Sequence, residues 1–111
     1  FEEVIKAILD RYKLPIRGGF KHNFDYDKVV PCISNFYNKN VSLDYFSKNL
    51  EKINSYEVCD LMSHPAFIEN FLINSTSYAI ERAKEHEILT SKEVEYFIKE
   101  NDIELVNYKN I

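Results

Sequence analysis

Short apolar runs alternate along this chain with segments of helical periodicity, and this alternation limits the folds open to it. Four segments place apolar residues three or four positions apart, as amphipathic helices do: residues 4–12, 43–53, 78–87 and 94–98. Three shorter apolar runs lie between or after them and favour strands: residues 16–17, 56–63 and 103–106. Such alternation is typical of α/β proteins, in which the strands pair in parallel. With 111 residues, the chain is predicted to form a single α/β domain.

Breaks and capping residues predict where these elements begin and end. Pro15 disfavours helix in the residue before it, so the first helix should end just ahead of it. Ser42 is a suitable N-cap for the next helix. Thr90 and Glu93 have the spacing of a capping box, in which two side chains and two backbone amides satisfy one another. The segment before Ser42 lacks a clear period, and a short helix near residues 32–37 is expected there.

The charge balance narrows the choice of partners. The net charge is −4 and the pI is near 5.4, whereas domains that bind phosphate backbones usually present a basic face. The lysines are scattered among acidic residues, as on an ordinary solvated surface. No apolar run reaches the roughly 18 residues of a membrane span. Neither a nucleic acid nor a membrane is therefore an expected partner.

The cysteines and the first residues bear on where the protein acts. Cys32 and Cys59 are far apart and form no Cys-x-x-Cys pair, so both are expected to be reduced thiols of a cytoplasmic protein. No signal peptide opens the sequence. Phe1 already lies inside a helical pattern, with no initiator methionine or capping residue before it. The chain is therefore expected to be a piece of a longer protein.

His64 is the residue best placed for chemistry. It directly follows the predicted strand 56–63, and in parallel α/β folds ligands gather at the carboxyl ends of the strands. A neutral imidazole there could bind a metal or move a proton, or it could merely hold the turn with Pro65. Asp60 lies four residues earlier, so the two-residue period of a strand would place both side chains on one face. Its carboxylate could serve the same site or anchor a neighbouring loop.

Arg82 is a candidate for substrate binding. Its planar guanidinium could hold an anionic or hydroxylated substrate. A salt bridge with Glu81 or Glu85 is the alternative. The sequence contains no Gly-x-Gly-x-x-Gly motif, no phosphate-binding loop and no Gly-x-Ser-x-Gly motif. Nothing therefore supports a nucleotide-binding fold or a serine or cysteine triad.

The other two histidines are weaker candidates. His22 lies near Asp25 and Asp27 in a predicted loop, and imidazole and carboxylates can both bind metal. Polar loops of this kind are mostly just solvated. His86 lies between two glutamates on a predicted helix and is expected on the surface.

Several motifs in the right order resemble the C-terminal part of the YdjC-like carbohydrate deacetylases, which include the chitooligosaccharide deacetylases. The resemblance covers "DLMSHPAFIENFL" (residues 60–72) and "STSYAIERAKEHEILTSKEVEYFIKENDIELVNY" (residues 75–108). The matching motifs are His64-Pro65-Ala66 at a strand end, Ser77-Tyr78 with Arg82, residues 88–91, and a closing strand at residues 103–108. Residues 1–17, "FEEVIKAILDRYKLPIR", also resemble the helix and strand that follow the family's His-rich metal motif.

The resemblance implies a fold and an activity. The fold would be the C-terminal part of a distorted (β/α) barrel of the polysaccharide-deacetylase type, like a TIM barrel. The whole protein would be a metal-dependent hydrolase that removes N-acetyl groups from amino sugars or chitooligosaccharides. The resemblance casts His64 as catalytic, in the role of proton donor, and Asp60, Tyr78 and Arg82 as substrate-binding residues.

The chain also departs from the family pattern. The N-terminal Asp motif and the middle His-x-His motif, which supply the metal ligands, do not occur in these residues. A divalent metal, magnesium or zinc, is therefore expected to take most of its ligands from outside this chain. Asp60 stands where the family usually has Glu, and Ala66 where Gly is common. A half barrel leaves strand edges exposed, so the rest of the protein or a homodimer partner is expected to cover them.

Two further functions compete with the deacetylase. One is a non-catalytic remnant of the same fold that binds a sugar or a protein. The other is a different hydrolase built on His22, Asp25 and Asp27.

Overall fold

The computed structural model of the chain describes residues 1–19, 21 and 23–111. In chain order its elements are α1 (Glu2–Tyr12), β1 (Ile16–Arg17), β2 (Val29–Val30), β3 (Cys32–Ile33), the 3-10 helix η1 (Asn38–Asn40), α2 (Tyr45–Lys48), α3 (Leu50–Asn54), β4 (Asp60–Leu61), α4 (Asn70–Ser75), α5 (Ile80–Leu89), α6 (Lys92–Glu100) and the 3-10 helix η2 (Tyr108–Asn110). Helices and parallel strands alternate, which confirms the predicted α/β class. No helix within the described ranges is both long and apolar enough to cross a membrane.

The strands form two short parallel pairs that follow one another along the chain at Pro31. β1 pairs in parallel with β2, and β3 pairs in parallel with β4. Only Pro31 separates β2 from β3, so residues 29–33 run between two neighbouring strands. The Gly18 amide donates to the Val30 carbonyl at 2.7 Å, and the Asp60 amide donates to the Pro31 carbonyl at 2.8 Å. β1 therefore pairs with the first half of segment 29–33 and β4 with the second half. Pro31, which has no amide proton to donate, lies at the point between the two halves.

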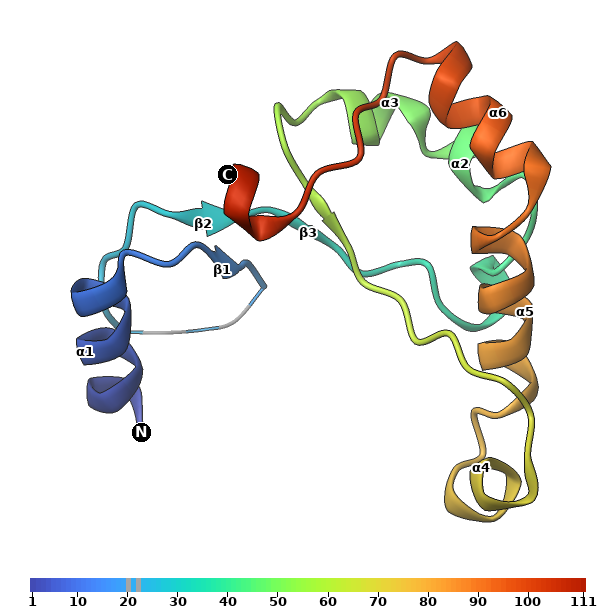
Figure 1. The fold of residues 1–111 in the computed structure, drawn as a ribbon, viewed down its shortest axis with the longest axis horizontal. Coiled ribbons are helices and arrows are strands. Elements are labelled where there is room, and N and C mark those ends of the chain that lie inside the picture. The colour runs from blue at the N-terminus through green and yellow to red at the C-terminus, as the bar shows by residue number, and fades with distance from the viewer. Residues whose placement is uncertain (20, 22) are drawn as a thin grey trace.

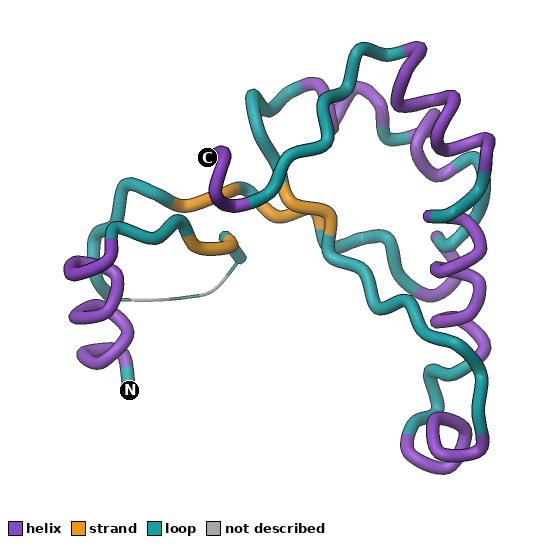
Figure 2. Tube along the Cα trace, in the orientation of Figure 1, coloured by secondary structure: helices purple, strands orange, loops and turns teal. Residues whose placement is uncertain are grey.

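The helices lie on both sides of the strands. Figures 1 and 2 show the strands in the middle, α1 at one end, and α2 to α6 forming a long helical arm on the other side. The arm contains the main core, a cluster of buried residues: Phe36, Tyr45, Phe46, Ile88 and Val94. The rings of Phe36 and Tyr45 lie 4.8 Å apart and are tilted, which is a favourable aromatic geometry. This core fixes α5 relative to the strands.

The chain is flat and open. Its principal extents are 39, 39 and 21 Å, and its radius of gyration is 16.4 Å, whereas a compact domain of about 100 residues has one of about 13 Å. Large apolar side chains are correspondingly exposed on α1 and around α4: Phe1, Val4, Ile8, Tyr12, Phe67, Ile68, Phe71 and Ile73. Exposed apolar surface on this scale is typical of interaction faces.

Three predicted elements differ from the structure. The strand expected at residues 56–63 is only Asp60–Leu61, because turns occupy the residues before it. The helix expected near residues 32–37 is wrong, since Cys32 and Ile33 pair with β4 instead. The last strand, expected at residues 103–106, is wrong as well: the chain is irregular there and ends in η2. Helix α4, in contrast, was not expected from the sequence.

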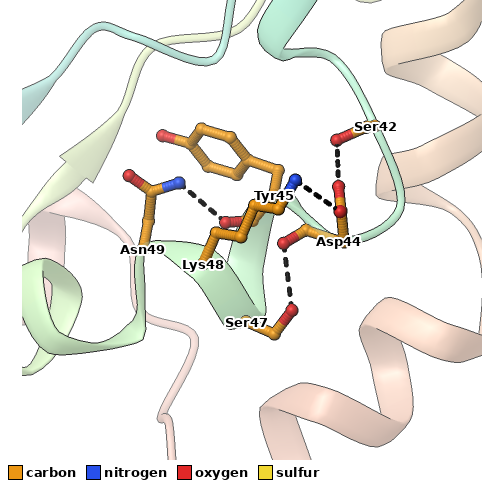
Figure 3. Close-up of polar contacts among 6 residues, drawn as sticks. All are labelled: Ser42, Asp44, Tyr45, Ser47, Lys48 and Asn49. Atoms are coloured by element: carbon orange, nitrogen blue, oxygen red, sulfur yellow. Dashed lines mark hydrogen bonds and ion pairs between the residues drawn. The ribbon is translucent and has the colours of Figure 1, made fainter.

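The helix expected over residues 43–53 is divided into α2 and α3 at Asn49. The side-chain Nδ2 of Asn49 donates to the Tyr45 carbonyl at 2.8 Å (Figure 3). Asparagine side chains compete in this way with the backbone hydrogen bonds of a helix. Ser42 is not the N-cap, because its hydroxyl donates to the Asp44 carboxylate. That carboxylate also pairs with Lys48 Nζ at 2.6 Å. The predicted N-cap is therefore wrong, and the first turn is held by an acidic side chain.

The cap of α6 lies one residue later than predicted. Thr90 donates its hydroxyl back to the His86 carbonyl at 2.8 Å and serves the preceding helix. Ser91 is the N-cap, and its hydroxyl accepts from the Val94 amide at 3.3 Å. Ser91 caps the helix because its backbone is extended, as an N-cap requires.

Candidate functional site

His64 lies just beyond the carboxyl end of β4. The Met62 amide still donates to the Ile33 carbonyl at 2.9 Å, which extends the pairing by one residue. The chain then leaves the strands through Ser63 and reaches His64, whose side chain is half-buried. The imidazole is thus at the edge of the sheet where ligands bind in parallel α/β proteins, and it is outside the main core cluster.

Helix α5 holds the backbone of His64 from both sides. The His64 amide donates to Glu85 Oε2 at 2.7 Å. The His64 carbonyl accepts from Arg82 Nη1 at 3.3 Å. Two residues later, the Ala66 amide donates to the Arg82 carbonyl at 3.2 Å. The turn that carries the histidine is therefore attached to one helix at three points.

The imidazole of His64 has one aromatic neighbour and one nitrogen without a hydrogen-bond partner among the described residues. The Tyr37 ring lies edge-on to it, with the ring centroids 6.1 Å apart. His64 Nδ1 is buried, and no hydrogen-bond partner for it occurs among the described residues. Buried polar atoms are usually hydrogen-bonded, so this nitrogen calls for a partner.

Tyr78 connects this site to the loop before α2. Its ring stacks on Tyr37, with centroids 4.4 Å apart and planes inclined by 12°. Its hydroxyl accepts from the Asn38 amide at 2.8 Å and donates to Glu85 Oε1 at 3.4 Å. Burial raises the pKa of the Tyr78 hydroxyl; the hydrogen bond from the Asn38 amide opposes this, and the nearby Glu85 adds to it. Both hydrogen bonds of the Tyr78 hydroxyl are thus made within the protein.

Arg82 lies beside these groups. Its guanidinium carbon is 5.8 Å from the centroid of the Tyr78 ring, within cation–π range. Its Nε is buried and lacks a hydrogen-bond partner in the described part of the chain. The alternative to a substrate role for Arg82 was a salt bridge with Glu81 or Glu85. No such ion pair occurs among the described residues.

Asp60 belongs to a different group of contacts. Its Oδ2 accepts from Arg17 Nε at 2.7 Å and from the Tyr108 hydroxyl at 2.6 Å. Although burial raises the pKa of Asp60, the hydrogen bonds from Arg17 and Tyr108 outweigh it and lower that pKa overall. β4 ends at Leu61, so the expectation that a continuous strand aligns Asp60 with His64 is wrong. The carboxylate anchors β1 and the C-terminal turn to β4.

The remaining candidates that the structure describes do not join the site. His22 lies outside the described residues. Within the described part of the chain, no three His, Cys, Asp or Glu side chains come together in a group that could hold a metal ion. His86, expected on the surface, is half-buried, and its ring lies 4.5 Å from that of Phe67. Cys32 and Cys59 are free and half-buried.

Two residues of the site were missed from the sequence. Glu85 is fully buried, although it was expected only as a surface partner for Arg82. The available signal was its position three residues before Ile88, on the face of α5 that enters the core. Tyr37 gave no such signal, because its contacts with Tyr78 and His64 depend on the tertiary fold.

The chain was compared with known protein families and with curated proteins. No protein-family model matches the chain. Three curated relatives are each named carbohydrate deacetylase: one from Clostridium beijerinckii (33% identical, 98% of this chain and 46% of the relative), one from Enterococcus faecalis (34%, 97% and 45%) and one from Vibrio campbellii (29%, 97% and 43%). The chain therefore spans a little under half the length of these relatives. The resemblance to the carbohydrate deacetylases is confirmed.

A solved structure agrees with the fold. It is a crystal structure from Enterococcus faecalis V583, provisionally described as a cellobiose-phosphate cleavage protein. The two chains superpose with a TM-score of 0.80 at 30% sequence identity, over 97% of this chain and 46% of that one. The open arrangement of helices and parallel strands is thus shared with a larger protein.

Proposed function

We propose that this chain, a relative of the carbohydrate deacetylases along nearly its whole length, is the C-terminal portion of such an enzyme and supplies His64 to its active site. The observation that carries the proposal is the half-buried imidazole beyond the end of β4, in a chain similar to these enzymes over 97% of its residues. Because the relatives are about twice as long, the activity belongs to the whole protein.

The strand arrangement supports a barrel for the whole protein. Strands in a closed barrel are tilted, and each is displaced along its neighbour. Here β1 pairs with the first half of segment 29–33 and β4 with the second half, which is a displacement of this kind. The exposed apolar side chains of α1 and α4 would then face the remainder of the barrel.

The chemistry proposed for His64 is proton transfer. In hydrolysis of an N-acetyl group, water adds to the amide carbonyl, the C–N bond breaks, and the departing nitrogen must gain a proton. A positioned imidazole can deliver that proton as a general acid. The products are acetate and the protonated amino sugar: of the two protons of the attacking water, one restores His64 and the other goes to the released amine.

The described residues do not supply a metal site. They contain no group of three metal-binding side chains, and Asp60 is already bound to Arg17 and Tyr108. The divalent metal implied by the resemblance would therefore take its ligands elsewhere in the whole protein. What these residues can do is carry His64, exclude water and present the Tyr78 and Tyr37 rings to a sugar.

The test is acetate release by the full-length protein. N-acetylglucosamine, N,N′-diacetylchitobiose and a phosphorylated diacetylchitobiose are suitable substrates; the phosphate on the last is chosen because of the description of the solved relative. His64→Ala should lower kcat by about 10²- to 10⁴-fold, the usual contribution of a general acid. His86→Ala, on the half-buried histidine of the same region, is the matched control and should retain its activity. Turnover by His64→Ala close to that of the wild type would refute the role of His64, whereas a wild-type protein that releases no acetate from any of these substrates would favour a non-catalytic binding protein.

A further inference from the structure

We propose that Glu85 is a positioning residue for His64, an inference that rests on the proposed function. Glu85 is the one charged side chain among the described residues that is fully buried. Burying a carboxylic acid is costly unless hydrogen bonds compensate for the lost water. Its two oxygens are used inward, one by the His64 amide and the other by the Tyr78 hydroxyl.

The contacts of Glu85 restrain the backbone from which the imidazole projects. The bond from the His64 amide to Glu85 Oε2 is 2.7 Å long, and the opposite end of the residue is held by Arg82 Nη1. Arg82 and Glu85 are three residues apart and share a face of α5. With its amide and its carbonyl both fixed to one helix, His64 has little freedom to rotate its peptide planes.

The second oxygen of Glu85 extends the restraint to the aromatic rings. It accepts from the Tyr78 hydroxyl, and the Tyr78 ring stacks on Tyr37, which lies edge-on to the imidazole. One carboxyl group thus links the proton donor to the two rings proposed to face the sugar. Losing it should misplace His64 relative to the substrate, and misplacement of about 1 Å can cost roughly 100-fold in rate.

The experiment compares two neutral variants in the full-length protein. Glu85→Met keeps the side-chain length but removes both oxygens, whereas Glu85→Gln retains one acceptor. We expect Glu85→Met to lower kcat on the order of 100-fold with KM changed little, and Glu85→Gln to recover most of the loss. Glu87→Gln, on an exposed glutamate of the same helix, is the control and should behave as wild type. A folded Glu85→Met variant with wild-type kcat would overturn the proposal.

Amide hydrogen exchange gives a readout that does not depend on activity. His64 lies outside every helix and strand, yet its amide should be protected in the wild-type protein and should exchange faster in Glu85→Met. A wild-type His64 amide that exchanges as fast as an open loop would overturn the positioning role, even where Glu85→Met does not fold. If the wild type releases no acetate but the amide is protected and depends on Glu85, the deacetylase proposal alone has failed.

Discussion

Asp60→Asn tests whether the contacts around Asp60 hold the strands to the C-terminal turn. The Asp60 side chain is 13% exposed and accepts from both Arg17 and Tyr108 through one oxygen. A hydrogen bond to a charged group contributes about 1.5–3 kcal/mol when buried, but the Arg17 side chain is 40% exposed, so solvent screening reduces its share. We expect the substitution to lower the free energy of unfolding by about 2 kcal/mol in total.

The pH dependence of this loss identifies its cause. The net effect of burial and of the bonds from Arg17 and Tyr108 is a lowered pKa for the folded Asp60 carboxyl, so its contribution is complete above the unfolded pKa, about 3.9, and is lost as the pH falls through the folded value. The stability gap between wild type and Asp60→Asn should be constant from about pH 5 to 8 and should narrow below about pH 4.

Urea unfolding of the full-length protein at several pH values measures the gap. Tyr108→Phe removes one donor to Asp60, and its effect should shrink in the Asp60→Asn background, because contacting residues are not additive. Asp10→Asn is the control: its carboxylate pairs with Lys6 on the exposed face of α1, so its loss should matter far less. No gap at neutral pH, or a gap of equal size at pH 3, would refute the reasoning.

Three further substitutions test the helical arm. Phe36→Ala removes a fully buried ring from the core cluster and should cost about 3–5 kcal/mol in thermal or urea unfolding; a cost below 1 kcal/mol would show that the core lies elsewhere. Ser91→Ala removes the N-cap of α6 and should cost about 1 kcal/mol, whereas Thr90→Ala should cost less. A larger cost for Thr90→Ala than for Ser91→Ala would instead favour the capping box predicted from the sequence.

The sequence predicted those elements whose signal is local. Helix α1 shows a strong apolar stripe, and the first short strand follows a proline break, so both were anticipated close to their observed ends. Residues 103–106 have the composition of a strand, but composition cannot show whether a partner strand is present. The same holds for Cys32 and Ile33, which form a strand only because β4 lies beside them.

In the candidate site, too, only the residues with a local signal could be predicted from the sequence. His64 could be singled out because the His-Pro pair follows an apolar run, which is a feature of the sequence itself. The link from His64 to Glu85 spans 21 residues and depends on where α5 packs, so no local pattern announces it. Asp60 was given a role beside His64 by strand periodicity, whereas its actual partners, Arg17 and Tyr108, lie 43 and 48 residues away.

Helix α5 touches both the turn of His64 and the core of the arm. Ile88, one turn beyond Glu85, is buried against the aromatic cluster. A substitution in that cluster that slid the helix along its axis would carry Glu85 and Arg82 with it and so redirect the imidazole. If the proposed function holds, such variants should lower kcat while KM changes little, so the core cluster would act on His64 from a distance through α5.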